Sequence, residues 1–156
     1  MKQSEKKRYI VIVLFCLYAV GMACLLFGRY SHWSGESYLE SVCRNINLIP
    51  FHTNISFLHS AISSHAGGSL SHAFINLAGN VVLFIPLGIF LPAIWIGLRH
   101  WWPFFGSVSC ILISVELLQL FSLRGICDVD DYLLNVLGAS VGYCLFRLYT
   151  HCRRVK

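Results

Sequence analysis

Charged residues are scarce in this sequence: Asp, Glu, Lys and Arg make up 12% of its 156 residues, whereas hydrophobic residues make up 56%. Soluble domains carry about twice that share of charge. The composition therefore excludes a soluble globular fold and indicates a protein that folds in a membrane. The formal net charge of +5 does not point to nucleic acid, because most basic residues lie near the two chain ends.

Motifs for metal binding and covalent catalysis are also missing. The sequence contains neither HExxH nor CxxC, and no serine or cysteine stands in a recognisable nucleophile elbow with a paired histidine. We therefore expect no cofactor and no metal, and whether the protein catalyses a reaction stays open. The seven cysteines form no pattern. Only Cys43 and Cys127 fall on the outer side, where they could form a disulfide.

Four apolar stretches, residues 9–28, 73–97, 101–122 and 132–149, are each close to the ~20 residues that cross a hydrocarbon core. In lipid, a helix satisfies every backbone polar group within its own segment. We therefore predict an all-α polytopic membrane protein with four transmembrane helices in a single domain, residues 1–156. The first stretch exceeds the core of a signal peptide and no small-x-small cleavage site follows it, so we interpret it as a retained anchor.

The distribution of Lys and Arg predicts the orientation. With four spans both termini share a side, and that side also holds the short connection containing Arg99. The other side holds only Arg29, Arg44 and Arg124 of the 12 basic residues. Positive charge marks the cytoplasmic side of a membrane. We therefore expect both termini in the cytoplasm.

The first outer segment, residues 29–72, is not uniform. Residues 46–58 include the apolar run Asn47-Leu48-Ile49-Pro50-Phe51, which a simple loop would expose to water. We therefore predict that residues 46–58 lie in the membrane interface or re-enter the helix bundle. Residues 60–72 are rich in Ser, Gly and His, which is typical of a flexible loop.

Two features predict how the helices pack. Only residues 98–100 join the second and third spans, which predicts an antiparallel hairpin of adjacent helices, and Pro86 and Pro92 should kink the second span. Gly138 and Gly142 form a small-xxx-small pair. Such a pair favours close helix packing, either within the bundle or between copies in a homo-oligomer.

Polar residues within the apolar stretches are the most informative feature. Glu116 lies about six residues before the outer end of the third span, ~9 Å below that boundary. An acid costs roughly 2.5–3.5 kcal/mol at the bilayer centre and somewhat less at this depth.

Asn80 lies at a similar depth in the second span, and Asn135 lies near the start of the fourth. Spacings of three or four residues extend each position into a stripe, through Asn76 with Asn80, Glu116 with Gln119, and Asp131 with Asn135. We expect these stripes to face one shared interior.

Three carboxylates, Asp128, Asp130 and Asp131, lie directly above this layer and repel one another unless a cation is near. Arg124 is the nearest candidate. A structural interpretation is also open, in which Asp128 or Asp130 caps the fourth helix and the asparagines join helices by hydrogen bonds. This structural interpretation explains Glu116 less well, because an acid inside a membrane span is by default a candidate for a functional residue. A metal site is a further alternative without motif support, with ligands from Glu116, Asp128, Asp131 and His52 or His72.

Four blocks of residues in order, within residues 47–143, resemble the VanZ-like family. They are Asn47-Leu48-Ile49-Pro50-Phe51, residues 80–88 (NVVLFIPLG), residues 114–119 (SVELLQ), and Arg124 followed by residues 128–138 (DVDDYLLNVLG). The resemblance implies a bacterial membrane protein, and the name-giving member is linked to reduced susceptibility to the glycopeptide teicoplanin. Residues 125–127 are Gly-Ile-Cys, where relatives often have Ser or Thr with Phe. The polar motif positions of the family correspond to Asn80, Glu116, Gln119, Arg124, Asp128, Asp131 and Asn135.

We expect an outward-facing polar pocket that binds or modifies an envelope component, such as a cell-wall precursor or a glycopeptide antibiotic. Arg124 would contact an anionic group, and Glu116 would accept a hydrogen bond or carry a proton. The expected ligand-binding residues are Asn76, Asn80, Glu116, Gln119, Arg124, Asp128, Asp130, Asp131 and Asn135. The catalytic candidates, if a reaction occurs, are Glu116, Asp128 and Asp131.

A noncatalytic membrane scaffold or subunit is the alternative function. It would associate with other proteins through the face of Gly138 and Gly142 and through residues 46–58. A transporter or channel comes third, because four helices rarely enclose a pathway without oligomerising.

Overall fold

The computed structural model describes residues 3–28, 35, 37–49 and 67–154 of the chain. Within them, four long helices dominate: α1 (Gln3–Phe27), α4 (Gly67–Ile94), α5 (Trp101–Phe121) and α6 (Val129–Arg154). Each contains a segment long and apolar enough to cross a membrane, namely Glu5–Phe27, Leu77–Ile94, Trp101–Phe121 and Val129–Arg153. The predicted all-α polytopic membrane protein with four spans is confirmed.

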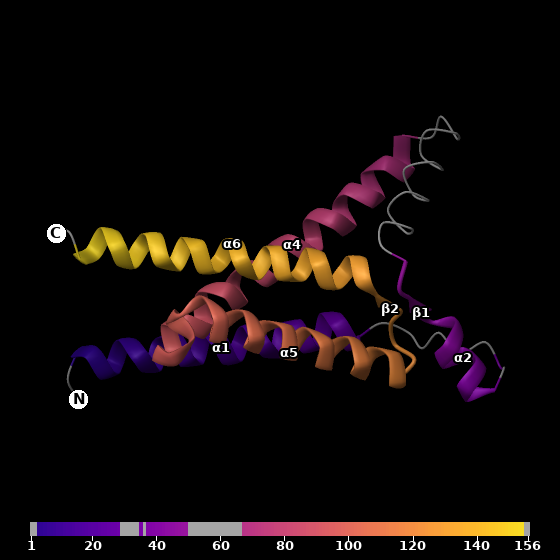
Figure 1. Cartoon of the computed structure of the whole chain (residues 1–156), viewed down its shortest axis with the longest axis horizontal. Helices are drawn as coiled ribbons and strands as arrows, with labels where there is room; N and C mark the ends of the chain where they lie inside the picture. Colours follow the sequence, from indigo (N-terminus) through magenta and orange to yellow (C-terminus); the bar gives the residue numbers. More distant parts are fainter. Residues whose placement is uncertain (1–2, 29–34, 36, 50–66, 155–156) are drawn as a thin grey trace.

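The two ends of the bundle differ. Figure 1 shows both chain termini at one end, which we call the terminal end, together with the turn between α4 and α5. At the opposite, distal end lie the short helix α2 (Tyr38–Arg44) and the strands β1 (Ile46–Asn47) and β2 (Cys127–Asp128). The two strands pair in parallel, and the backbone N–H of Cys127 donates to the carbonyl of Asn45 at 2.9 Å. The segment that follows α2 and the connection between α5 and α6 are therefore joined at the distal end.

Helix α4 crosses α6 at very short range (Figure 1). A Cβ atom on Gly138 would overlap the carbonyl oxygen of Val81, and one on Gly142 would overlap that of Ile85. On α4, a Cβ on Gly88 would overlap the carbonyl of Ala139. Only glycine lets two backbones approach this closely. The close packing predicted for Gly138 and Gly142 thus occurs within one chain, and we call these three glycines the glycine crossing.

Helix α5 and helix α1 complete the bundle. Phe104 of α5 stacks against Tyr143 of α6, with ring centroids 4.4 Å apart. Helix α1 is peripheral, since only 6% of its span is buried against 33% in each of the others. It is fastened to α4 by Tyr18, whose hydroxyl donates to the Leu83 carbonyl at 2.8 Å. Its exposed apolar side chains, such as Leu17, suit contact with lipid.

Several boundaries differ from the sequence expectation. Residues 67–72, expected to be a flexible loop, form the first turns of α4, because extending an existing helix costs far less than nucleating one. Helix α4 runs through both prolines but ends at Ile94 rather than residue 97, and the 3₁₀ helix η1 (Ile96–Arg99) follows. Helix α4 packs mainly on α6, with few contacts to α5. Of the predicted interfacial segment, residues 46–49 are described and include β1, whereas residues 50–58 lie outside the described residues.

Candidate functional site

Glu116 lies on the buried face of α5. Burial recurs at every fourth position of this helix, through Phe104, Val108, Leu112, Glu116 and Leu120. The Glu116 side chain is 7% exposed, and it lies five residues before Phe121, about 7.5 Å from the end of the helix. The acid therefore faces the interior of the bundle at its distal end and not the lipid.

A second polar contact joins α4 to α6. The side-chain amide of Asn80 donates to a carboxylate oxygen of Asp131 at 2.6 Å. Asn80 immediately precedes Val81, whose carbonyl packs on Gly138. The close approach of the two backbones at the glycine crossing therefore places this amide within reach of the acid.

Asp128 holds the start of α6 and also the β1–β2 pair. One of its carboxylate oxygens accepts the backbone N–H of Asp130 at 2.8 Å, which makes Asp128 the N-cap of α6. The other accepts the side-chain amide of Asn47 at 3.1 Å. The capping role considered for Asp128 is thus observed. Asn47 was not among the expected site residues, although it opens the first block of the family resemblance.

Glu116 lies among these acids. The Glu116 carboxylate lies near the backbone of Asp128, and Asp131 and Asp128 are close enough to act on it electrostatically. Its second oxygen, Oε2, is buried and has no hydrogen-bond partner among the described residues, and the same holds for Oδ1 of the buried Asn135. We call Asn80, Glu116, Asp128, Asp131 and Asn135 the polar cluster. Such unused buried acceptors are rare in a fold that serves packing alone.

Other expected site residues lie elsewhere. Gln119 donates to the carbonyl of Leu26 at 3.0 Å, and Arg124 donates to that of Phe27, so both side chains satisfy carbonyls at the C-terminus of α1. Asp130 is buried beside the cluster at the first turn of α6. Asn76 lies in α4, but its side chain is outside the described part.

A pocket of about 320 Å³ opens beside Glu116. Its lining comes from α5, from β2 and the start of α6, and from the residue after β1: Ile113, Glu116, Leu117, Cys127, Asp128, Val129, Tyr132 and Leu48. Nearly all of the pocket surface is apolar, although the acidic residues Glu116 and Asp128 are part of its lining.

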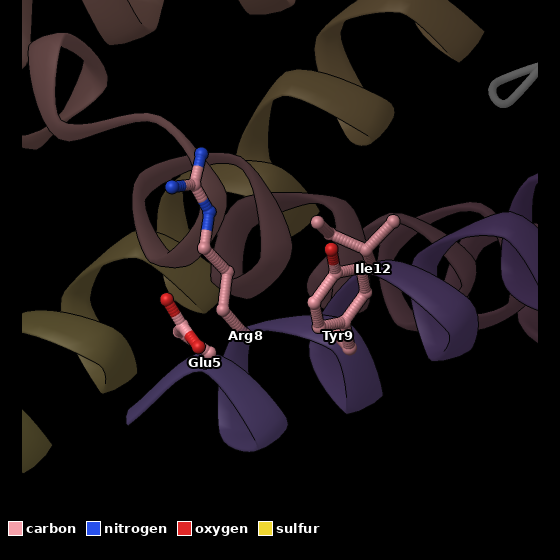
Figure 2. A pocket seen from close by; sticks show the side chains of 4 residues that line it. All are labelled: Glu5, Arg8, Tyr9 and Ile12. Carbon is pink, nitrogen blue, oxygen red and sulfur yellow. The ribbon is translucent and has the colours of Figure 1, made fainter. Parts of the chain in front are cut away.

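Other pockets lie at the terminal end and contain none of the expected site residues. Figure 2 shows one, in which Arg8 extends away from α1 between Glu5 and the pair Tyr9 and Ile12. A larger pocket of about 660 Å³ is lined by basic side chains, including Lys7, Arg99 and Arg153.

The cysteines and the serine considered near the site form neither a disulfide nor a nucleophile elbow in the described part of the chain. Cys43 and Cys127 are free thiols and not a disulfide. Burial raises the pKa of the Cys127 thiol, and the neighbouring Glu116 and Asp128 carboxylates raise it further. Residues 138–142 have the letters GxSxG, but they lie inside α6, where Ser140 donates to the Val136 carbonyl at 2.7 Å. They are therefore not a strand-to-helix nucleophile elbow.

A metal centre has no assembled ligand set in the described part of the chain, where no three His, Cys, Asp or Glu side chains are grouped to hold an ion. The histidines considered as ligands, His52 and His72, have no described side chains.

The comparisons with known proteins agree with the sequence motifs. The family model described as VanZ/LLP1 matches residues 15–150, which is most of the chain and includes the whole polar cluster. No curated protein and no solved structure shows a significant match.

Proposed function

Since the chain belongs to the VanZ/LLP1 family, we propose that it is a membrane-embedded binding protein whose polar cluster recognises an envelope component or a glycopeptide antibiotic such as teicoplanin. Binding at this site would lower the susceptibility of the cell to the antibiotic. Recognition uses hydrogen-bond acceptors, with Glu116 as the central one.

The proposal rests on the buried Oε2 of Glu116, which has no hydrogen-bond partner among the described residues. A carboxylate buried in a membrane helix is costly, and a residue kept only for packing would have both oxygens engaged. Asp131 and Asp128 each have a carboxylate oxygen bonded by an asparagine amide, whereas Glu116 Oε2 points to no described donor. A ligand with N–H or O–H groups would supply the hydrogen-bond donor that Glu116 Oε2 lacks among the described residues. If a reaction also takes place, Glu116 is the group placed to accept its proton.

The proposed orientation puts the polar cluster on the outer face. Basic side chains gather at the terminal end, where Lys7, Arg8, Arg99 and Arg153 line a single pocket. Positive charge is retained on the cytoplasmic side. The distal end then faces the cell wall, where glycopeptides and cell-wall precursors occur.

The test is teicoplanin susceptibility in a bacterial host that produces the wild-type chain, Glu116→Gln or Asp131→Asn at equal membrane levels. We expect wild type to raise the inhibitory concentration at least fourfold and both variants to lose that increase. Glu5→Gln is the matched control, because Glu5 is an exposed acid at the terminal end and should retain the full effect. Retained tolerance in both cluster variants would refute the proposal.

A further inference from the structure

The pocket beside Glu116 has its apolar side on the surface that faces lipid. Ile113 and Leu117 lie one turn apart on α5, inside its membrane span, and are 49% and 42% exposed. Leu48, at the distal end of the pocket, is 65% exposed. In a bilayer the side chains of Ile113 and Leu117 border lipid chains and not water. A molecule could therefore reach Glu116 sideways from the membrane.

The two acidic residues in the lining would favour a positively charged group. Glu116 and Asp128 both line the pocket, and Asp131 acts on Glu116 from the adjoining turn of α6. A phosphate or carboxylate head would be repelled by these like charges. An ammonium head offers three N–H donors and a compensating charge. One of those donors would supply the hydrogen bond that the buried Oε2 of Glu116 lacks among the described residues.

We propose that this pocket takes an amine-bearing amphiphile of the bilayer, with its ammonium group on Glu116 and Asp128 and its alkyl chain along Ile113 and Leu117. The inference rests on the proposed function and specifies its class of ligand. It concerns a lipid-like molecule that enters from the membrane, in contrast to a water-soluble ligand that enters from the distal end.

The test is photo-crosslinking in phosphatidylcholine nanodiscs with a dodecylamine that carries a diazirine on its chain. We expect mass spectrometry to find label on the two pocket segments, residues 113–117 and 127–132. Dodecyl phosphate with the same diazirine should label them at least fivefold less. Glu116→Gln should reduce amine labelling to the phosphate level while the protein stays monodisperse.

The matched pair Leu117→Trp and Leu118→Trp tests the route along the chain. Leu117 lines the pocket, whereas Leu118 is an exposed neighbour that does not. We expect Leu117→Trp to reduce labelling at least threefold and Leu118→Trp to leave it unchanged. Unlabelled dodecylamine should compete with the probe, and butylamine should not.

The outcomes separate the inference from the proposed function. Equal labelling by amine and phosphate probes, or undiminished labelling in Glu116→Gln, would overturn the ammonium assignment. Competition by butylamine as strong as by dodecylamine would overturn entry from the bilayer. In either case the proposed function would still stand if Glu116→Gln abolished teicoplanin tolerance, and it would fall if tolerance were retained.

Discussion

Two adjacent regions of α4 and α6 are built in opposite ways. At the glycine crossing, the backbones of the two helices touch and no side chain separates them. Beside it, an amide of α4 bonds to a carboxylate of α6, Glu116 approaches from α5, and two buried oxygens of the polar cluster have no described partner.

The difference indicates that the glycine crossing positions the helices and that the polar cluster serves the proposed binding function. The glycine crossing has no spare volume, and its contacts serve only to fix the position of α4 on α6. The polar cluster depends on that fixed position, since Asn80 reaches Asp131 one residue away from the Val81–Gly138 contact. One region should therefore govern stability and the other function, and substitutions can separate the two.

The largest effect is expected at the glycine crossing. Gly138→Val places branched carbon atoms against the Val81 carbonyl, and overpacking of this kind destabilises by about 3 kcal/mol or more. The measurement is the temperature at which half of the protein remains monodisperse in mild detergent, together with teicoplanin tolerance, and both should fall. Gly106→Val and Gly21→Val are the matched controls, because nothing lies within 4 Å of a Cβ at either helical position. A Gly138→Val protein as stable as these controls would show that the helices can separate without harm.

The second effect separates function from stability. Glu116→Gln keeps the shape of the side chain and removes a buried charge that lies near two other acids. We expect unchanged or higher stability, by up to about 2 kcal/mol, because the cost of burying the acid is relieved. Tolerance should nevertheless be lost. A fall in stability as large as that of Gly138→Val would instead make Glu116 a structural residue.

Sequence reasoning found most of this arrangement. The four spans follow from length and apolarity alone. The approach of Asn80, Glu116 and Asp131 could be anticipated, because a polar residue inside a membrane span tends to turn inward and the interior of a small bundle is shared.

The remaining features depend on contacts between distant segments. The β1–β2 pair has two residues in each strand, which is too short for any periodic pattern, so the bond from Asn47 to Asp128 could not be read from the sequence. The spacing of three residues predicts that Gln119 shares a helix face with Glu116. Three residues turn a helix by about 300°, and the remaining offset of about 60° is enough to direct Gln119 to α1.

The third prediction concerns the link between the two regions. Asn80→Ala and Asp131→Ala each remove one partner of the 2.6 Å hydrogen bond. We expect a coupling energy of about 1.5 kcal/mol in the double-mutant cycle, at the lower end of the range for hydrogen bonds to a charged group. The cycle is measured by thermal stability in detergent, and the same cycle between Asn80 and Gln119 should give no coupling. Additive effects of Asn80→Ala and Asp131→Ala would mean that the bond does not join α4 to α6.

The smallest effect is expected at Gln119, and it tests the boundary of the polar cluster. Gln119→Leu removes the hydrogen bond to the Leu26 carbonyl, which should lower stability by about 1 kcal/mol because the end of α1 loses one donor. Teicoplanin tolerance should stay at the wild-type level, since this side chain is directed to α1 and not to Glu116. The family motif includes both Gln119 and Glu116, so the motif alone does not distinguish their roles. Loss of tolerance in Gln119→Leu at normal stability would extend the ligand site across α5 to α1.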